Sequence, residues 1–326
     1  MLLEKAAAYH LTALRGRTCS PHTLRQYALV HRGFIAYAEH VQGAPPTVAA
    51  LTAEHVRGYL AAHAERGMAP ASLNVHTAVL RAWCRVLADD LGLWPDGHPL
   101  ARLKAARAPK TVPAVLTRQQ FDLLAALAAQ ARHPLRSVAI LKLLVETGTR
   151  NNELCTLRLA DYQPATAALA GRILVRAGKG GTQRHVGFGQ EASNAVAAYL
   201  KRERQGGLDN PWLFSSAAGG HLNTDTVRKL LAALRAQAGL SEDIHPHTLR
   251  HTFATWRTKA GMNASVLQHQ LGHATIEQSQ RYVTLAAQDV ESSYISMLDG
   301  PTPRVRPLRA GRHCTTCGCH APGAAS

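Results

Sequence analysis

The sequence predicts a mainly α protein of two domains, with a small antiparallel β-sheet confined to the second domain. The chain has 326 residues, which suits two domains better than one. Apolar residues recur at helical spacing through most of it, whereas residues 172–176 and 183–188 have the pattern of two strands joined by a glycine-rich turn. We therefore divide the chain into an N-terminal helical bundle (1–102), a basic linker (103–115), a mixed α+β domain (116–299) and a disordered tail (300–326).

Three helix starts are visible in the first domain. Ser20 and Pro21 supply an N-cap hydroxyl and a proline at the first helical position. A second helix follows Thr52 and ends at Gly67, and a third follows Pro70. Their apolar positions lie on helical stripes, and we expect them to form the core: Leu24, Tyr27, Phe34, Tyr37, Val56, Tyr59, Leu60, Val75, Val79, Trp83, Val86 and Leu87.

The segment between the domains is basic and proline-bearing and has few large apolar groups, as is typical of a linker. Lys104 and Lys110 in it would attract a phosphate backbone without regard to sequence, and salt should weaken that attraction. Arg25 and Arg81 on the first-domain helices are further candidates for phosphate contacts. A solvated polar face explains these two arginines equally well.

The second domain begins with a clear helix signal. Thr117 and Gln120 match a capping box, and residues 134–147 form a strongly apolar helical stretch that Gly148 closes. Near the end of the domain, residues 290–298 have a short apolar face, which makes them a candidate for docking on a neighbouring subunit. The chain shows no internal repeat.

Charge and hydropathy narrow the choice of partner. The formal net charge is +16 and is spread along the chain, which favours a polyanion such as double-stranded DNA, although a merely soluble basic protein is the alternative. No apolar run reaches the length needed to cross a bilayer, and the amino terminus lacks the pattern of a signal peptide. We expect a cytoplasmic, nucleoid-associated protein. Cys19, Cys84 and Cys155 stand singly in predicted helices, as structural thiols do.

The stretch from His247 to Ala254 contains the strongest functional signal. His247 and Arg250 are three positions apart, so on a helix they share a face and can converge on one small anion. Leu271-Gly272-His273 follows, and then Arg281 beside Tyr282. A cation, imidazoles and a phenol are the groups that attack on a phosphodiester requires, since the arginine binds the charge, a histidine moves the proton and the phenol can attack phosphorus.

Two upstream segments supply further cations. Arg150 stands just after Gly148, and Glu153 could orient it or simply pair with it. Lys179 stands on the glycine-rich turn between the strands, and Arg184 on the returning strand could add a phosphate contact. Each of these residues alone has an ordinary surface explanation.

In chain order, Arg150, Lys179, His247, Arg250, His273 and Tyr282 resemble the active site of the tyrosine recombinase, or phage integrase, family and are similar to its Xer-like members. The resemblance implies a SAM-like core-binding domain followed by the tyrosine recombinase catalytic domain. It implies that Tyr282 forms a 3′-phosphotyrosyl bond with DNA and that Lys179 is the general acid. It also implies that His247 exchanges a proton with Tyr282 and that His273 hydrogen-bonds the scissile phosphate. The chain differs from many relatives at Thr284, where they have a histidine.

Neither a metal nor a cofactor is expected. Asp161 and Asp243 are isolated, so a two-metal nuclease is disfavoured, and the chain has no Walker-type phosphate loop. The tail has a crowded Cys/His segment from His313 to His320 with one Cys-x-x-Cys pair, for which a disordered tail is the better interpretation than a zinc site.

The leading hypothesis is a site-specific DNA recombinase that works through a Holliday junction, either as a homotetramer on two DNA sites or together with a paired recombinase. Two alternatives remain open. One is relaxation of supercoils by a type IB topoisomerase-like enzyme, and the other is a non-catalytic DNA-binding protein that retains the fold. Assembly on two sites, supercoil relaxation or binding without nicking would separate these hypotheses.

Overall fold

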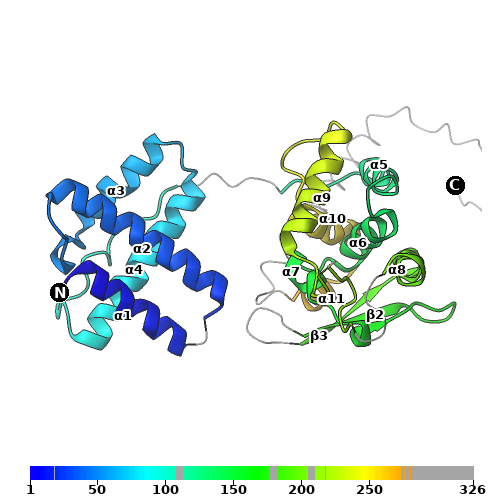
Figure 1. The fold of residues 1–326 in the computed structure, drawn as a ribbon, viewed down its shortest axis with the longest axis horizontal. Coiled ribbons are helices and arrows are strands. Elements are labelled where there is room, and N and C mark those ends of the chain that lie inside the picture. Colours follow the sequence, from blue (N-terminus) through cyan, green and yellow to red (C-terminus); the bar gives the residue numbers. More distant parts are fainter. Residues whose placement is uncertain are drawn as a thin grey trace, which may run out of the picture. The chain divides into compact units, whose positions relative to one another are not determined.

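The computed structural model describes residues 1–17, 19–107, 113–176, 183–204, 210–216, 218–272, 275 and 280. Contacts divide the chain into two compact units, Met1–Thr111 and Val112–Ser326, and each is described by itself (Figure 1). Several predictions concern residues outside the described ranges: Lys110, the turn at 178–181 with Lys179, His273, Tyr282, the apolar face at 290–298 and the tail at 300–326.

The amino-terminal unit is a helical bundle (Figure 1). Its described residues form α1 (Leu3–Gly16), α2 (Pro21–Gln42), the 3-10 helix η1 (Val48–Ala50), α3 (Ala53–Glu65) and α4 (Pro70–Leu91). The predicted starts of α2 and α3 are confirmed, because the hydroxyl of Ser20 accepts the amide N–H of Thr23 at 3.1 Å and that of Thr52 accepts the amide of His55 at 3.2 Å. No predicted helix corresponds to α1, which begins without a capping side chain or a proline.

The core of this unit surrounds Trp83. Its ring is fully buried, and its Nε1 donates to the carbonyl oxygen of Ala6 at 3.1 Å, which ties α4 to α1. The core prediction is wrong for Val75, which is 39 % exposed, since it lies about 200° around the helix from Leu73 and Thr77, the residues that face inward at that end of α4. Leu24, also predicted as core, is only partly buried. Leu103 packs into the same core although the linker was predicted to begin there.

In the carboxy-terminal unit, the described elements begin with α5 (Arg118–Ala128), α6 (Pro134–Thr147), α7 (Asn151–Cys155) and η2 (Leu159–Asp161). The strands β1 (Tyr162–Gln163), β2 (Gly171–Val175) and β3 (Arg184–Phe188) follow, and then α8 (Gln190–Arg202), α9 (Thr224–Gln237), α10 (Pro246–Lys259) and α11 (Ala264–Leu271). The fold class is therefore confirmed: mostly helical, with a small antiparallel sheet. Two details differ from prediction. Cys19 precedes α2 rather than lying in a helix, and β1 is too short to have a sequence signature.

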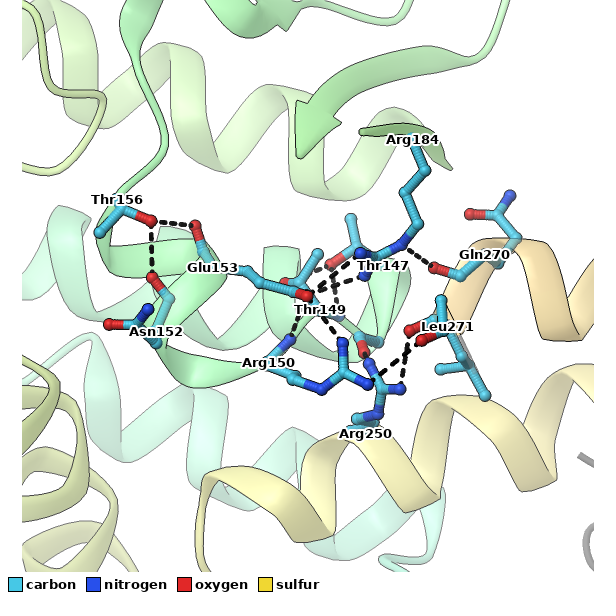
Figure 2. A network of polar contacts seen from close by, with 12 residues as sticks. Thr147, Thr149, Arg150, Asn152, Glu153, Thr156, Arg184, Arg250, Gln270 and Leu271 are labelled. Atoms are coloured by element: carbon cyan, nitrogen blue, oxygen red, sulfur yellow. Dashed lines mark hydrogen bonds and ion pairs between the residues drawn. The ribbon is translucent and has the colours of Figure 1, made fainter. Parts of the chain in front are cut away.

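The sheet has the order β1-β2-β3 and is antiparallel throughout. Gly171 pairs with Phe188 and Val175 pairs with Arg184, which is the first residue of β3. The predicted pair of strands is confirmed within one residue at each end. This register places Arg184 at the edge of the unit's core, beside α7 and α11 (Figures 1 and 2).

At the centre of the carboxy-terminal unit, α6 packs against α5, α8, α10 and β3. Its predicted extent and its closure by Gly148 are both confirmed. The capping box of α5 is confirmed as well, because Thr117 and Gln120 exchange side-chain and backbone hydrogen bonds at 3.1 and 2.9 Å. A buried central helix thus delivers the segment that follows Gly148 to a fixed position.

Candidate active site

Gly148 allows the end of α6 to touch α10 and α11 closely. It is left-handed, with φ +62°, and a Cβ atom there would lie 2.4 Å from Cδ1 of Phe253 and 2.9 Å from Cδ2 of Leu271. Only glycine fits both the backbone conformation and this contact. The sequence motif after α6 is therefore held directly against α11 and against α10, which contains His247 and Arg250.

Arg150 stands at the N-cap of α7 and is held by Glu153. One carboxylate oxygen of Glu153 accepts the backbone N–H of Arg150 at 2.8 Å, and the other accepts from Nη1 of its guanidinium, also at 2.8 Å. Nη2 of Arg150 donates to the carbonyl of Gly272 at 3.2 Å. The Arg150 side chain keeps 31 % of its surface exposed, so a phosphate can approach it.

Arg250 extends from α10 and is only 2 % exposed. Its Nη1 donates to the carbonyl of Gly148 at 2.8 Å and its Nη2 donates to the carbonyl of Leu271 at 2.7 Å. These bonds join the ends of α6 and α11 through one guanidinium. Arg150 and Arg250, two arginines of the predicted active site, thus lie together, although 100 positions separate them in the sequence (Figure 2).

Three arginines meet at the carboxyl end of α11. Nε of Arg184 donates to the carbonyl of Gln270 at 3.0 Å, so the consecutive carbonyls of Gln270, Leu271 and Gly272 receive Arg184, Arg250 and Arg150 in turn (Figure 2). The last carbonyls of a helix have no partner within the helix and form the negative end of its dipole. This helix end is a natural place to hold several cations.

Glu153 is the negative charge among these cations. It is 4 % exposed and lies between Arg150 and Arg184, whose Nη1 and Nη2 donate to its two oxygens at 3.1 and 2.8 Å. Burial by itself would raise the pKa of Glu153, but hydrogen bonds and charge from Arg184 and Arg150 outweigh burial and lower the pKa below its ordinary value. The carboxylate is therefore ionised at neutral pH. Three guanidiniums and one carboxylate leave these four side chains with a net charge of two positives.

His247 stands one turn before Arg250 on α10 and is exposed at the surface of the unit. Partial burial of the ring and the charges of Arg250, His245 and Arg150 lower the pKa of His247. The lowered pKa keeps the His247 imidazole neutral at physiological pH. The neutral imidazole is the form that accepts a proton.

His251 lies one turn beyond His247 on α10, and the two ring centroids are 4.7 Å apart. Burial and the neighbouring groups His247 and Arg250 lower the pKa of His251 to about 4. It packs against His247 as a neutral ring.

Arg184 was predicted as a phosphate contact, but its side chain is buried and donates to protein groups. It is 7 % exposed, and its three nitrogens donate to Glu153 and Gln270. Sequence reasoning also missed Gln270, whose side-chain oxygen accepts the backbone N–H of Gly187 at 3.2 Å. Nothing in the spacing of these residues could have indicated this contact between β3 and α11.

The remaining predicted DNA contacts lie in the amino-terminal unit. Arg25 and Lys104 are exposed, whereas Nε of Arg81 donates to the carbonyl of Leu100 at 3.1 Å. Within the described ranges, His, Cys, Asp and Glu side chains do not gather in any group that could hold a metal ion. The same part of the chain contains no helix with the length and hydropathy of a membrane span.

Curated relatives identify the class of enzyme. The chain is 35 % identical over 285 residues to the tyrosine recombinase XerC of Rhodospirillum centenum, covering 85 % of this chain and 82 % of that one. It is 31 % identical over 311 residues to XerC of Chromohalobacter salexigens, covering 93 % and 97 % of the two chains. With this likeness and this fold, the protein is an enzyme of the tyrosine recombinase class.

Family comparisons agree for both parts of the chain. The sequence model of the phage integrase family matches residues 114–289, and that of the phage integrase N-terminal SAM-like domain matches residues 8–90. The chain belongs to the phage integrase family. The SAM-like domain and the catalytic domain that the sequence resemblance implied are thereby confirmed.

Solved structures share the fold. A structure of the XerH site-specific recombinase bound to a palindromic difH substrate has a TM-score of 0.70 and 19 % identity, covering 87 % of this chain and 82 % of that one. A lambda integrase dimer bound to a COC' core site has a TM-score of 0.65 and 19 % identity, covering 85 % and 96 %. At this level of identity, the likeness concerns the fold alone.

Proposed function

We propose that this tyrosine recombinase cleaves and rejoins duplex DNA at specific sites, through a 3′-phosphotyrosyl intermediate and a Holliday junction. The observation that best supports this chemistry is the cluster of three arginines and Glu153 at the end of α11. A phenolate that attacks a phosphodiester brings together two negative charges, and the cluster has two net positives. Fixed, preorganised charge of this kind is the main means by which proteins stabilise such a transition state.

Within this proposal, Arg150 and Arg250 bind the nonbridging oxygens of the scissile phosphate. Arg150 is the more exposed of the two and meets the phosphate first. Arg250 mainly fixes the ends of α6 and α11 around the same point. A guanidinium fork suits both tasks because it donates in several directions and stays charged at any physiological pH.

The remaining steps follow the family pattern. Tyr282 attacks phosphorus, Lys179 protonates the leaving 5′-oxygen, and His273 hydrogen-bonds the phosphate. His247, neutral because of its lowered pKa, accepts the proton of Tyr282. A free phenol has a pKa of about 10, so nucleophilic attack at neutral pH needs both this base and the adjacent cations.

The partner in this proposal is double-stranded DNA, contacted through Arg25, Arg81, Lys104 and Lys110. Four copies on two DNA sites, or two copies with a paired recombinase, provide the four cleavage events that exchange requires. The reaction takes place in the cytoplasm on nucleoid DNA. Relatives in the solved structures are bound to DNA, as XerH is to difH, which supports this choice of partner.

The test uses a duplex with a nick close to the cleavage point, from which the short 5′ fragment diffuses away and leaves the covalent adduct trapped. Wild-type protein is expected to form an adduct that survives denaturation, and Tyr282→Phe is expected to form none. An adduct from Tyr282→Phe would show that another residue is the nucleophile. Relaxation of any supercoiled plasmid without site preference would favour the topoisomerase-like alternative instead.

A further inference from the structure

Arg184 is a buried cation whose side chain is turned toward protein groups. Two of its nitrogens donate to the two oxygens of Glu153 at 3.1 and 2.8 Å, and the third donates to the carbonyl of Gln270 at 3.0 Å (Figure 2). Its side chain is 5 % exposed and that of Glu153 is 3 % exposed. A buried ion pair with such complete hydrogen bonding fixes both partners in one geometry.

The charge of Arg184 changes what Glu153 does to Arg150. Glu153 binds the backbone and the guanidinium of Arg150, so it determines where Arg150 points. If Glu153 had Arg150 as its single counterion, one negative charge would cancel the cation meant for the phosphate. With Arg184 on the same carboxylate, Glu153 still orients Arg150, but its charge is already balanced.

Arg184 also connects strand β3 to the end of α11. Gln270 receives Nε of Arg184 on its backbone carbonyl and the N–H of Gly187 on its side-chain oxygen, at 3.0 and 3.2 Å. Gly272 lets the guanidinium pack against its backbone, because a Cβ atom at Gly272 would lie 2.9 Å from the guanidinium carbon. The carbonyl that holds Nη2 of Arg150 belongs to this same glycine.

We propose that Arg184 is a positioning residue: it neutralises Glu153 and fixes the end of α11, so that Arg150 presents an uncancelled charge to the scissile phosphate. This inference rests on the proposed function and assigns a role to a residue that does not itself touch the DNA. It replaces the phosphate contact that the sequence suggested for Arg184.

The first test compares two kinds of scissile linkage in the nicked duplex. One is the natural phosphodiester, and the other is a methylphosphonate, in which a methyl group replaces a nonbridging oxygen and removes the charge. Relative to wild type on the same linkage, Arg184→Met should slow adduct formation on the phosphodiester on the order of 10- to 100-fold. On the neutral linkage Arg184→Met should slow the reaction by less than about threefold, since the linkage then has no negative charge for Arg150 to bind. Equal losses on both linkages would overturn the proposal, because a general structural defect has no preference for charge.

The matched control is Arg172→Met, on the neighbouring strand β2. Arg172 is exposed, and its guanidinium donates to Gln163 at 3.1 Å rather than to Glu153. It should leave adduct formation unchanged on either linkage. If Arg184→Met behaved like this control, Arg184 would have no positioning role.

The second test removes the charge that Arg184 balances. In the Glu153→Gln, Arg184→Met double variant, the single amide oxygen can still accept one of the two hydrogen bonds that Arg150 donates to Glu153, and no negative charge remains to be compensated. This double variant should react at least about fivefold faster on the phosphodiester than Arg184→Met alone, as expected when one charge is the whole cause of the loss. A double variant as slow as the single variant would overturn the proposal. Far-ultraviolet circular dichroism at the assay temperature verifies that both variants are folded.

A binding measurement separates failure of this inference from failure of the proposed function. In a Tyr282→Phe background, we would plot log affinity for duplex DNA against log salt concentration. Arg184→Met should reduce the magnitude of the slope by about 0.9, which is the change expected when one phosphate contact is lost. If wild-type protein formed no adduct on any duplex, the assignment of a cleavage function would fail. An unchanged salt slope would instead count against the role of Arg184, whether or not the protein cleaves.

Discussion

Arg150 and Arg250 donate to adjacent peptide carbonyls, those of Gly272 and Leu271, at 3.2 and 2.7 Å. Arg150 comes from the start of α7 and Arg250 from the middle of α10, so the end of α11 is where the two segments are brought into register. The separation between the two guanidiniums is therefore set by the backbone of one helical turn. Three predictions test this arrangement and its surroundings, and a fourth concerns two buried histidines of the amino-terminal unit.

Substitution of Gly148 by alanine should destabilise the carboxy-terminal unit and slow DNA cleavage together. The new Cβ would meet Phe253 at 2.4 Å, and the backbone conformation is unfavourable for alanine. The control is Gly239→Ala, where φ is +63° but no atom lies within 4 Å of the added Cβ. We expect Gly148→Ala to lose about 1–3 kcal/mol more of the free energy of unfolding than this control, by denaturant titration. Equal losses would mean that the contact with α10 and α11 is unimportant.

Replacement of Arg250 by lysine should reduce stability as well as activity. An ammonium group cannot reach the carbonyls of Gly148 and Leu271 with the fork geometry of the guanidinium. At 2 % exposure, the unpaired carbonyls would also be cut off from water. The expected cost is about 2 kcal/mol in the free energy of unfolding. Arg228→Lys, on the exposed face of α9, should cost almost nothing, and a similar cost at both sites would argue against the role of Arg250.

Cleavage should decline at acidic pH because His247 becomes protonated. Partial burial and the charges of Arg250, His245 and Arg150 lower the pKa of His247, so its neutral form persists below the ordinary value of about 6.5. The midpoint of the acid limb in single-turnover rates should therefore lie below pH 6.5. His247→Gln should slow cleavage by about 100-fold and abolish this acid limb. An acid limb that survives in His247→Gln would have to come from another group.

The amino-terminal unit should lose stability in acid through His10 and His31. Their rings are buried, Nδ1 of His10 lies 3.2 Å from Nε2 of His31, and burial is the main cause that lowers the pKa of His10 to about 4 and that of His31 to about 3. The unfolded chain, with histidine pKa values of about 6.5, takes up protons first as the pH falls. Stability is thus complete above pH 6.5 and declines below it, by up to about 1.4 kcal/mol per pH unit for each histidine.

Urea titrations between pH 4.5 and 7.5 would measure this decline. Replacement of both histidines, as in His10→Leu with His31→Phe, should flatten the dependence of unfolding free energy on pH in this window. His40→Gln, on the same helix as His31 but exposed, should leave the dependence as it is in the wild type. A slope that persists without His10 and His31 would assign the acid sensitivity to other groups.

Local signals predicted most of the fold correctly. Ser20, Thr52 and Thr117 cap helices as expected, and Gly148 ends α6 where the pattern placed the end. Each of these features depends on residues within one turn of each other, so the sequence contains the complete signal. α1 and β1 have no such signal, because one lacks a capping side chain and the other has only two residues.

The site was harder to predict because its contacts join distant segments. The convergence of Arg150 with Arg250 could be expected from the family resemblance, but the partners of Arg184 could not. Glu153 is 31 positions away from Arg184 and Gln270 is 86 positions away, and no periodicity relates them.

Since the carbonyls of three successive residues receive three arginines, the terminal turn of α11 is an anchor that the three cations of the site share. A rotation or displacement of that turn would move one hydrogen-bond partner of every guanidinium at the same time. A change at the end of this one helix would therefore alter the contacts of all three cations together.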